Sequence, residues 1–449
     1  MTGYRRAVWL LVAVILLTQA FIELQVVYGR VNVPVVDLAA LLLGVLVAGG
    51  LILPKVGSSL AAWLRSLHSL RLDDLRTVSS FRRDAALEPG AFEAMPLVLP
   101  ALLPFALFIA AGLLSAVPSP WRLESLYFLL RKPLFCYLAY GVGLTGVLLW
   151  LQNLRAIYLL VLAAATLMSI VCIGMTLPLW LMGHFTTFQP VPYLAVNQKA
   201  FAVALAPYLP FIWMGRDAWS PQIRRFAMGV LGLAGVAIVM TVSKNAWITA
   251  AFALFGLARW PLRRGPRLLR QPALMGCVVL GCTGLMVLLP FLLQDRMMSD
   301  AFDSRMSLNV RAWEMFIRHP IVGYGAGTST LFEISTFPHY RINGVDAHGV
   351  IQKVAPELGL LGIGAYLWFV WAVMQWLWRR AFGSSVGDGP TSVAGSSGDR
   401  DPLLVGAVTL GLALYVNLLL STEAFTSSHW VPLSLALAVG LQGGKLERR

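Results

Sequence analysis

The chain has 449 residues, of which 58% are hydrophobic and only 12% are charged, and its mean hydropathy is +0.73. A soluble domain of this length cannot bury so much apolar surface, so the composition indicates an integral membrane protein. The formal net charge of +14 does not indicate a nucleic-acid partner, because the basic residues are spread over short segments between apolar spans, where they set topology and contact membrane lipids.

Apolar runs of about twenty residues match the thickness of the hydrocarbon core and predict about twelve membrane spans. In chain order these spans lie near residues 7–27, 33–53, 97–117, 134–151, 155–181, 200–215, 226–243, 246–258, 272–294, 352–378, 402–421 and 430–443. The sequence therefore predicts an all-α, polytopic membrane protein with three parts. Residues 1–294 hold spans one to nine, residues 295–350 form one large loop, and residues 351–449 hold spans ten to twelve.

The distribution of lysine and arginine predicts the orientation of these spans. The densest basic segments, at residues 55–83 and 259–270, fall in connections that share one side of the membrane. Short basic connections face the cytosol. We therefore predict that both termini are cytoplasmic and that the loop at 295–350 is exoplasmic.

The motif content narrows the chemistry. The sequence holds no P-loop, no HExxH, no nucleophile elbow and no dinucleotide fingerprint. Paired carboxylates that suit a divalent cation are scarce on the predicted exoplasmic side. We predict neither a metal site nor a cofactor.

The exoplasmic loop and its neighbouring span ends concentrate cationic and imidazole side chains. These candidates are Arg305, Arg311, His339, Arg341 and His348 in the loop, with Lys199 and Lys244 at the outer ends of the sixth and eighth spans. A cation at the membrane edge either has a function or extends its charge to the interface. Several such groups that converge would suit a diphosphate, because guanidinium groups bind phosphate oxygens in pairs and lysine adds a point charge.

Structural roles are the alternatives for the same side chains. His348 would then cap the tenth span, Arg305 would brace the loop, and Lys244 would only reach the interface. Glu357 suits two further roles, orienting a basic side chain or capping a helix.

Two patterns carry a resemblance to a known family. His348 is followed nine residues later by Glu357, and then by Gly359 and Gly362. This run resembles the H-N-x-x-L-x-x-x-x-E-x-G signature that opens a late span in the O-antigen ligase and polymerase superfamily. Arg305 lies fifteen residues before a Pro-x-x-Gly-x-Gly turn, an order and spacing similar to that family's loop.

Further elements extend the resemblance over most of the chain. Ser243-Lys244 stands where the family usually has Ser-Arg, and Asn197 is similar to its Pro-Asn element. The sequence also departs from the pattern. Lys244 keeps the charge of the expected arginine without its paired donors, Gly349 replaces the usual asparagine, and Gln352 replaces leucine.

The resemblance implies a function in the bacterial inner membrane. Family members transfer a glycan from an undecaprenyl pyrophosphate carrier to an acceptor sugar, with inversion and without metal. His348 would be the general base, since an imidazole titrates near neutrality. Arg305, Arg311, Arg341, Lys199, Lys244 and His339 would bind the diphosphate or glycan. The acceptor is lipid A-core for a ligase, the reading favoured here, or another lipid-linked repeat unit for a polymerase.

Two other classes of protein are alternatives. A flippase or transporter of lipid-linked oligosaccharides would carry charged residues inside its spans, and these are few here. A structural subunit of an envelope complex would use the loop as a docking surface.

Overall fold

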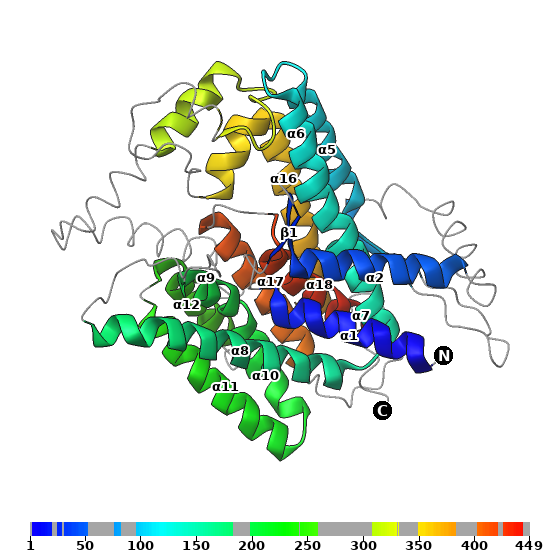
Figure 1. The fold of residues 1–449 in the computed structure, drawn as a ribbon, viewed down its shortest axis with the longest axis vertical. Coiled ribbons are helices and arrows are strands. Elements are labelled where there is room, and N and C mark those ends of the chain that lie inside the picture. Colours follow the sequence, from blue (N-terminus) through cyan, green and yellow to red (C-terminus); the bar gives the residue numbers. More distant parts are fainter. Residues whose placement is uncertain are drawn as a thin grey trace, which may run out of the picture.

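The computed structural model describes residues 2–19, 25–28, 31–52, 76–81, 96–182, 198–241, 243–258, 308–329, 331, 349–382, 402–420 and 425–442. This part of the chain is predominantly helical (Figure 1). The helices are α1 (Thr2–Thr18), α2 (Val35–Ile52), α5 (Leu102–Ala116), α6 (Arg122–Leu129), α7 (Thr145–Leu151), α8 (Leu154–Leu181), α9 (Gln198–Leu205), α10 (Tyr208–Gly215), α11 (Pro221–Met240), α12 (Lys244–Ala258), α16 (Val350–Phe382), α17 (Pro402–Leu420) and α18 (Ser427–Gln442). Residues 308–318 form a further helix.

The structure contains two small antiparallel hairpins that the all-α prediction did not include. Strand β1 (Gln25–Tyr28) pairs with β2 (Val31–Pro34), and β3 (Val78–Phe81) pairs with β4 (Leu97–Pro100). The predicted first span therefore ends as a helix at Thr18, and the predicted span at 97–117 begins as a strand. The β-branched valines in all four strands favour the extended backbone.

Several helices are long and apolar enough to cross a membrane, so the chain is a multi-pass membrane protein. Among the described residues these are Arg122–Leu151, Leu154–Leu181, Pro221–Met240 and Val350–Ala381, and shorter apolar helices cover Val35–Val47, Leu102–Ala116 and Pro402–Leu418. The predicted span at 272–294 lies outside the described residues. The count of twelve spans stays a prediction.

Hydrogen bonds join both ends of α1 to helices that are far away in the sequence. Arg5 Nη2 in α1 donates to the carbonyl of Leu151 at the end of α7, at 3.2 Å. At the opposite ends, Tyr208 Oη donates to Gln19 Oε1 at 2.6 Å, and Ser427 Oγ donates to the Gln19 carbonyl at 3.2 Å. The starts of α10 and α18 thus meet the end of α1.

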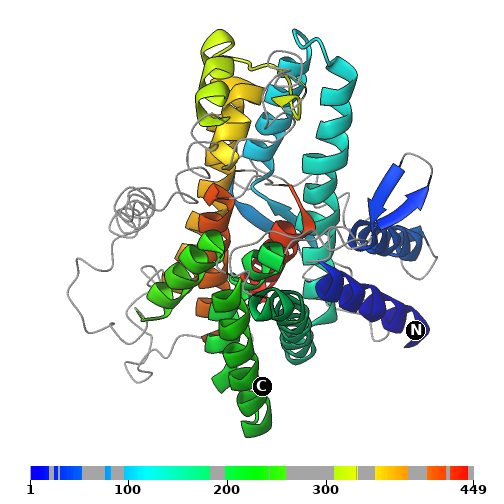
Figure 2. The same ribbon diagram turned by 60° about the vertical axis from the view of Figure 1, so that its left-hand side comes forward.

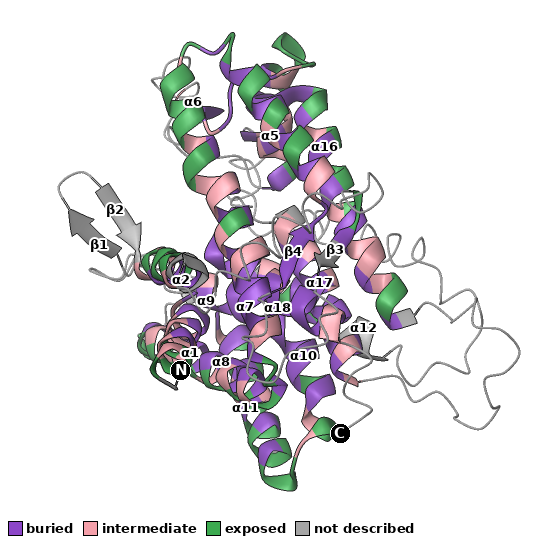
Figure 3. Cartoon of the chain, turned by 90° about the vertical axis from the view of Figure 1, so that its right-hand side faces the viewer, coloured by how far each residue is buried: buried purple, intermediate pink, exposed green. Residues whose placement is uncertain are grey.

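The best-buried region lies around α7, α18 and the segment that precedes α7 (Figure 3). That segment contains two π-helical stretches, η1 (Leu130–Leu134) and η2 (Cys136–Leu144). Pro133 lies within η1 and cannot donate an intrahelical hydrogen bond, which favours such a local change of winding. In η2 the ring of Tyr137 stacks on Phe105 with centroids 4.0 Å apart, and this fixes the segment against α5.

Helices α5, α6 and α16 stand together and extend away from the other helices (Figures 1 and 2). The helix at 308–318 and the turn that follows it lie at the end of this group, beside the start of α16. The candidate site lies in this group.

Candidate functional site

Helix α16 is broken at Gly359, and a turn at residues 320–325 packs into the break. Gly359 has φ of +64°, and Pro356 lies one turn earlier. The freed carbonyls of Pro356 and Glu357 accept hydrogen bonds from the amides of Tyr324 and Gly325 at 3.0 and 2.9 Å. A break in a membrane helix is tolerated where neighbouring groups satisfy the freed backbone.

The same turn also satisfies the other half of the break. The amides of Leu360 and Leu361 donate to the carbonyls of Pro320 and Ile321 at 2.8 and 3.3 Å. The Pro-x-x-Gly-x-Gly turn and the Glu-x-Gly pattern are separate motifs in the sequence. In the structure they form one hydrogen-bonded unit.

Two glycines permit this close approach. Gly323 has φ of +74°, and a Cβ at this position would lie 2.3 Å from the carbonyl carbon of Glu357. A Cβ on Gly359 would lie 2.3 Å from the carbonyl oxygen of Ile321. Gly359 thus packs against a loop and is not a contact point between helices.

Glu357 fixes the next part of the turn. Its side chain is only 3% exposed, and its carboxylate accepts hydrogen bonds from the amide of Gly327 at 2.8 Å and from Ser329 Oγ at 2.8 Å. A buried carboxylate requires such donors. Of the two roles that the sequence left open for Glu357, these contacts are closest to capping, since residue 329 begins a new helical turn.

A pocket of about 80 Å³ adjoins this unit. It is lined by α5, the helix at Arg122–Leu151, the first turns of α16, Ala326 of the turn and Phe425. Its cationic side chains are Lys132 and Lys353, and Lys353 Nζ lies 5.8 Å from the ring centroid of Phe128. An ammonium near an aromatic ring, in a pocket lined mainly by apolar side chains, suits an anionic ligand. We call this space the lysine pocket.

The carboxylate of Asp37 is close enough to Lys132 of the lysine pocket for the two charges to interact. Tyr140 Oη donates to Asp37 Oδ1 at 2.6 Å, and the charges of Lys132 and Arg131 act on this carboxylate. Asp37 thereby links α2 to the wall of the pocket. Among the described residues, no group of histidine, cysteine and carboxylate side chains could hold a metal ion.

Four of the predicted site residues lie outside the described residues. They are Arg305, His339, Arg341 and His348. His348 is nevertheless close in sequence to the lysine pocket, because Val350, two residues later, lines it.

The other three predicted residues fall on described elements. Arg311 is on the helix at 308–318, which precedes the turn at 320–325, and is 5% exposed. Lys199 lies in the first turn of α9 and is partly exposed, and Lys244 is the first residue of α12. Helices α9 and α12 contact each other, so these two lysines begin neighbouring helices and lie on different elements from Arg311.

Lys132 and Lys353 were not among the predicted site residues. Each is a cation at the outer end of a predicted span, and that property alone is a signal for a functional residue. Their convergence depends on how α16 packs against the helix at Arg122–Leu151, which the spacing of apolar residues does not reveal.

Comparison with known proteins places the site in a family context. Residues 229–367 match the family model of the O-antigen ligases. The matched region holds the later part of α11, all of α12, the turn at 320–325 and the start of α16 with Lys353 and Glu357, whereas Lys132 lies before it. No curated protein matches the chain significantly. The resemblance to the O-antigen ligase superfamily that the sequence predicts is thereby confirmed over residues 229–367.

Proposed function

We propose that the protein is an inverting, metal-independent glycosyltransferase of lipopolysaccharide assembly in the bacterial inner membrane. It transfers a glycan from an undecaprenyl pyrophosphate carrier to the sugar of lipid A-core. The observation that carries the proposal is the lysine pocket, because one of its two cations and the glutamate beside it belong to the segment that matches the O-antigen ligases.

The diphosphate of the donor binds at the lysine pocket. Lys132 and Lys353 approach it from different helices, and Arg305 and Arg311 add charge from the loop. Two ammonium groups in a pocket lined mainly by apolar side chains attract a diphosphate more strongly than they would in water. The polyprenyl chain stays in the bilayer, so the reacting anomeric carbon is held at the membrane surface.

His348 acts as the general base. The acceptor hydroxyl gives its proton to the imidazole as its oxygen forms a bond to the anomeric carbon. The bond from that carbon to the diphosphate oxygen breaks on the opposite face, so the anomeric configuration inverts. The lysines stabilise the charge that collects on the leaving diphosphate, which is where fixed cations lower the barrier most.

A reconstituted transfer reaction tests this proposal. The purified full-length chain is incubated with an undecaprenyl-pyrophosphate-linked glycan and lipid A-core, and products are resolved by electrophoresis and mass spectrometry. We expect a covalent product that survives a chelator and is lost in His348→Ala. Undiminished turnover in His348→Ala would remove the proposed base.

Two further outcomes concern the class of function. Extension of the donor glycan by a second lipid-linked repeat, without transfer to lipid A-core, would make the protein a polymerase. Movement of the donor across proteoliposomes without any new glycosidic bond would make it a transporter and overturn the proposal.

A further inference from the structure

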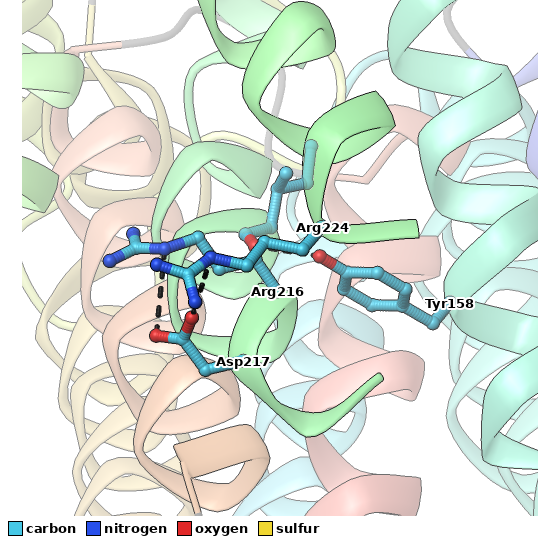
Figure 4. Close-up of polar contacts among 5 residues, drawn as sticks. Tyr158, Arg216, Asp217 and Arg224 are labelled. Carbon is cyan, nitrogen blue, oxygen red and sulfur yellow. Dashed lines mark hydrogen bonds and ion pairs between the residues drawn. The ribbon is translucent and has the colours of Figure 1, made fainter. Parts of the chain in front are cut away.

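A second cationic cluster lies far from the lysine pocket, at the connection between α10 and α11. Arg216 Nε lies 3.5 Å from Asp217 Oδ2, and Arg224 Nε lies 3.4 Å from Asp217 Oδ1. Figure 4 shows both guanidinium groups turned toward this one carboxylate. One negative charge is thus shared by two positive charges, which leaves the cluster cationic.

Arg216 is held in place, although its hydrogen bonding is incomplete. Its guanidinium carbon lies 3.5 Å from the ring centroid of Trp213, and its side chain is only 16% exposed. Within the described part of the chain, the buried Nη1 of Arg216 and the buried Nε1 of Trp219 have no hydrogen-bond acceptor. Buried donors without acceptors are rare in folded proteins, and a charged one is the most costly.

The two incomplete donors belong to one neighbourhood. The ring of Tyr158 lies 5.8 Å from the ring of Trp219, and the charge of Arg216 acts on the Tyr158 hydroxyl. That hydroxyl is already engaged, because it donates to the carbonyl of Ile212 at 2.7 Å. Within the described residues no acceptor remains for the two donors, and a bound anionic group would supply one.

The surroundings of the cluster favour a lipid as the source of that group. The connection between α10 and α11 is assigned to the cytosolic membrane surface by the predicted topology. Large apolar side chains near the arginines are exposed: Trp213 is 37% exposed and Phe226 is 49% exposed. Cations and indole rings at the inner surface of a membrane are the groups that contact anionic lipid headgroups.

We infer that Trp213, Arg216, Asp217, Trp219 and Arg224, together the Arg216 cluster, form a binding site for the phosphate of an anionic phospholipid in the inner leaflet. Arg216 Nη1 and Trp219 Nε1 donate to its phosphate oxygens, and Arg224 supplies additional charge. The acyl chains run along the exposed apolar face of α11. This inference is independent of the proposed glycosyl transfer.

Lipid retention by the intact chain tests the inference. The full-length protein is purified in detergent, loaded with phosphatidylglycerol or phosphatidylcholine, and examined by native mass spectrometry. We expect selective retention of phosphatidylglycerol, and a loss of affinity on the order of tenfold in Arg216→Ala, since hydrogen bonds to charged groups are the strong ones. Arg225→Ala is the matched control, because Arg225 is an exposed arginine on α11 next to Arg224, and it should retain the lipid.

Two additional arms keep the inference falsifiable. If Arg216→Ala does not fold, Trp219→Phe keeps an aromatic ring and removes only the indole donor, and it should weaken retention about threefold. Inorganic phosphate in millimolar excess should not displace the lipid. Equal retention of both lipids, equal retention by Arg216→Ala and Arg225→Ala, or displacement by inorganic phosphate would overturn the assignment.

Discussion

Glu357 holds Gly327 through a hydrogen bond of 2.8 Å between its carboxylate and the backbone amide of the glycine, across 30 residues of sequence. The same carboxylate accepts from Ser329 Oγ. One side chain of a membrane helix thus fixes the chain segment at residues 327–329.

Replacing this carboxylate should destabilise the protein. In Glu357→Ala the buried donors of Gly327 and Ser329 lose their acceptor, which costs about 1–3 kcal/mol each. We expect a lower midpoint in thermal unfolding of the detergent-purified protein, with a smaller loss for Glu357→Gln because its amide oxygen still accepts. Glu314→Ala changes an exposed glutamate on the helix at 308–318 and serves as the control. Equal midpoints for Glu357→Ala and Glu314→Ala would show that the carboxylate does not hold the turn.

The glycines of the α16 break should not tolerate a side chain. A methyl group on Gly323 would lie 2.3 Å from the backbone of Glu357, and one on Gly359 would lie 2.3 Å from Ile321. Both positions also have positive φ. We expect Gly323→Ala and Gly359→Ala each to cost more than about 2 kcal/mol, measured as loss of folded, monodisperse protein on size exclusion.

Gly364→Ala provides the comparison for these two variants. Gly364 is in the same helix, and an added Cβ would meet nothing within 4 Å. It should fold like the parent chain. The packing argument fails if all three alanine variants behave alike.

The two lysines of the pocket should contribute to turnover through their charge. Removing one ammonium from a diphosphate site costs on the order of ten- to a hundredfold in kcat/KM, since hydrogen bonds to charged groups are worth about 1.5–3 kcal/mol. We therefore expect losses of this size in Lys132→Ala and Lys353→Ala, with recovery in the arginine variants. The exposed Arg318 provides a charge-matched control variant, Arg318→Ala, in the same transfer assay. Full activity in both lysine variants would place the diphosphate elsewhere.

Lys244 is the first residue of α12, and the O-antigen ligase superfamily usually has an arginine at the corresponding position. If its side chain binds phosphate, Lys244→Arg should keep activity and Lys244→Ala should lose it in a glycan transfer assay. The same activity in both variants would mean that Lys244 only reaches the membrane interface.

The apolar runs of the sequence predict the helices better than any other part of the structure. The apolar run at 155–181 became α8 at Leu154–Leu181, where Asn153 Oδ1 accepts from the Ala156 amide and caps the first turn. A membrane imposes one length and one polarity on every span, so composition alone predicts such a helix. The hairpins were missed because short strands leave no comparable signal.

The predicted site residues stay predictions, and the contacts around them follow only in part from the sequence. One motif contains Glu357 and Gly359, whereas their partners in the turn at 320–325 belong to another motif. Lys132 lies more than 200 residues before Lys353 in sequence, and no local pattern joins them. Contacts of this kind follow from helix packing and from backbone hydrogen bonds, which periodicity does not encode.

The break in α16 has a mechanical consequence. Pulling the turn at 320–325 out of the break would leave two carbonyls and two amides of α16 without their hydrogen-bond partners, which is costly wherever water is scarce. The turn and the residues of α16 on both sides of Gly359 therefore move together as one unit. A displacement of the turn would be passed to α16 and to Lys353, which α16 contributes to the lysine pocket.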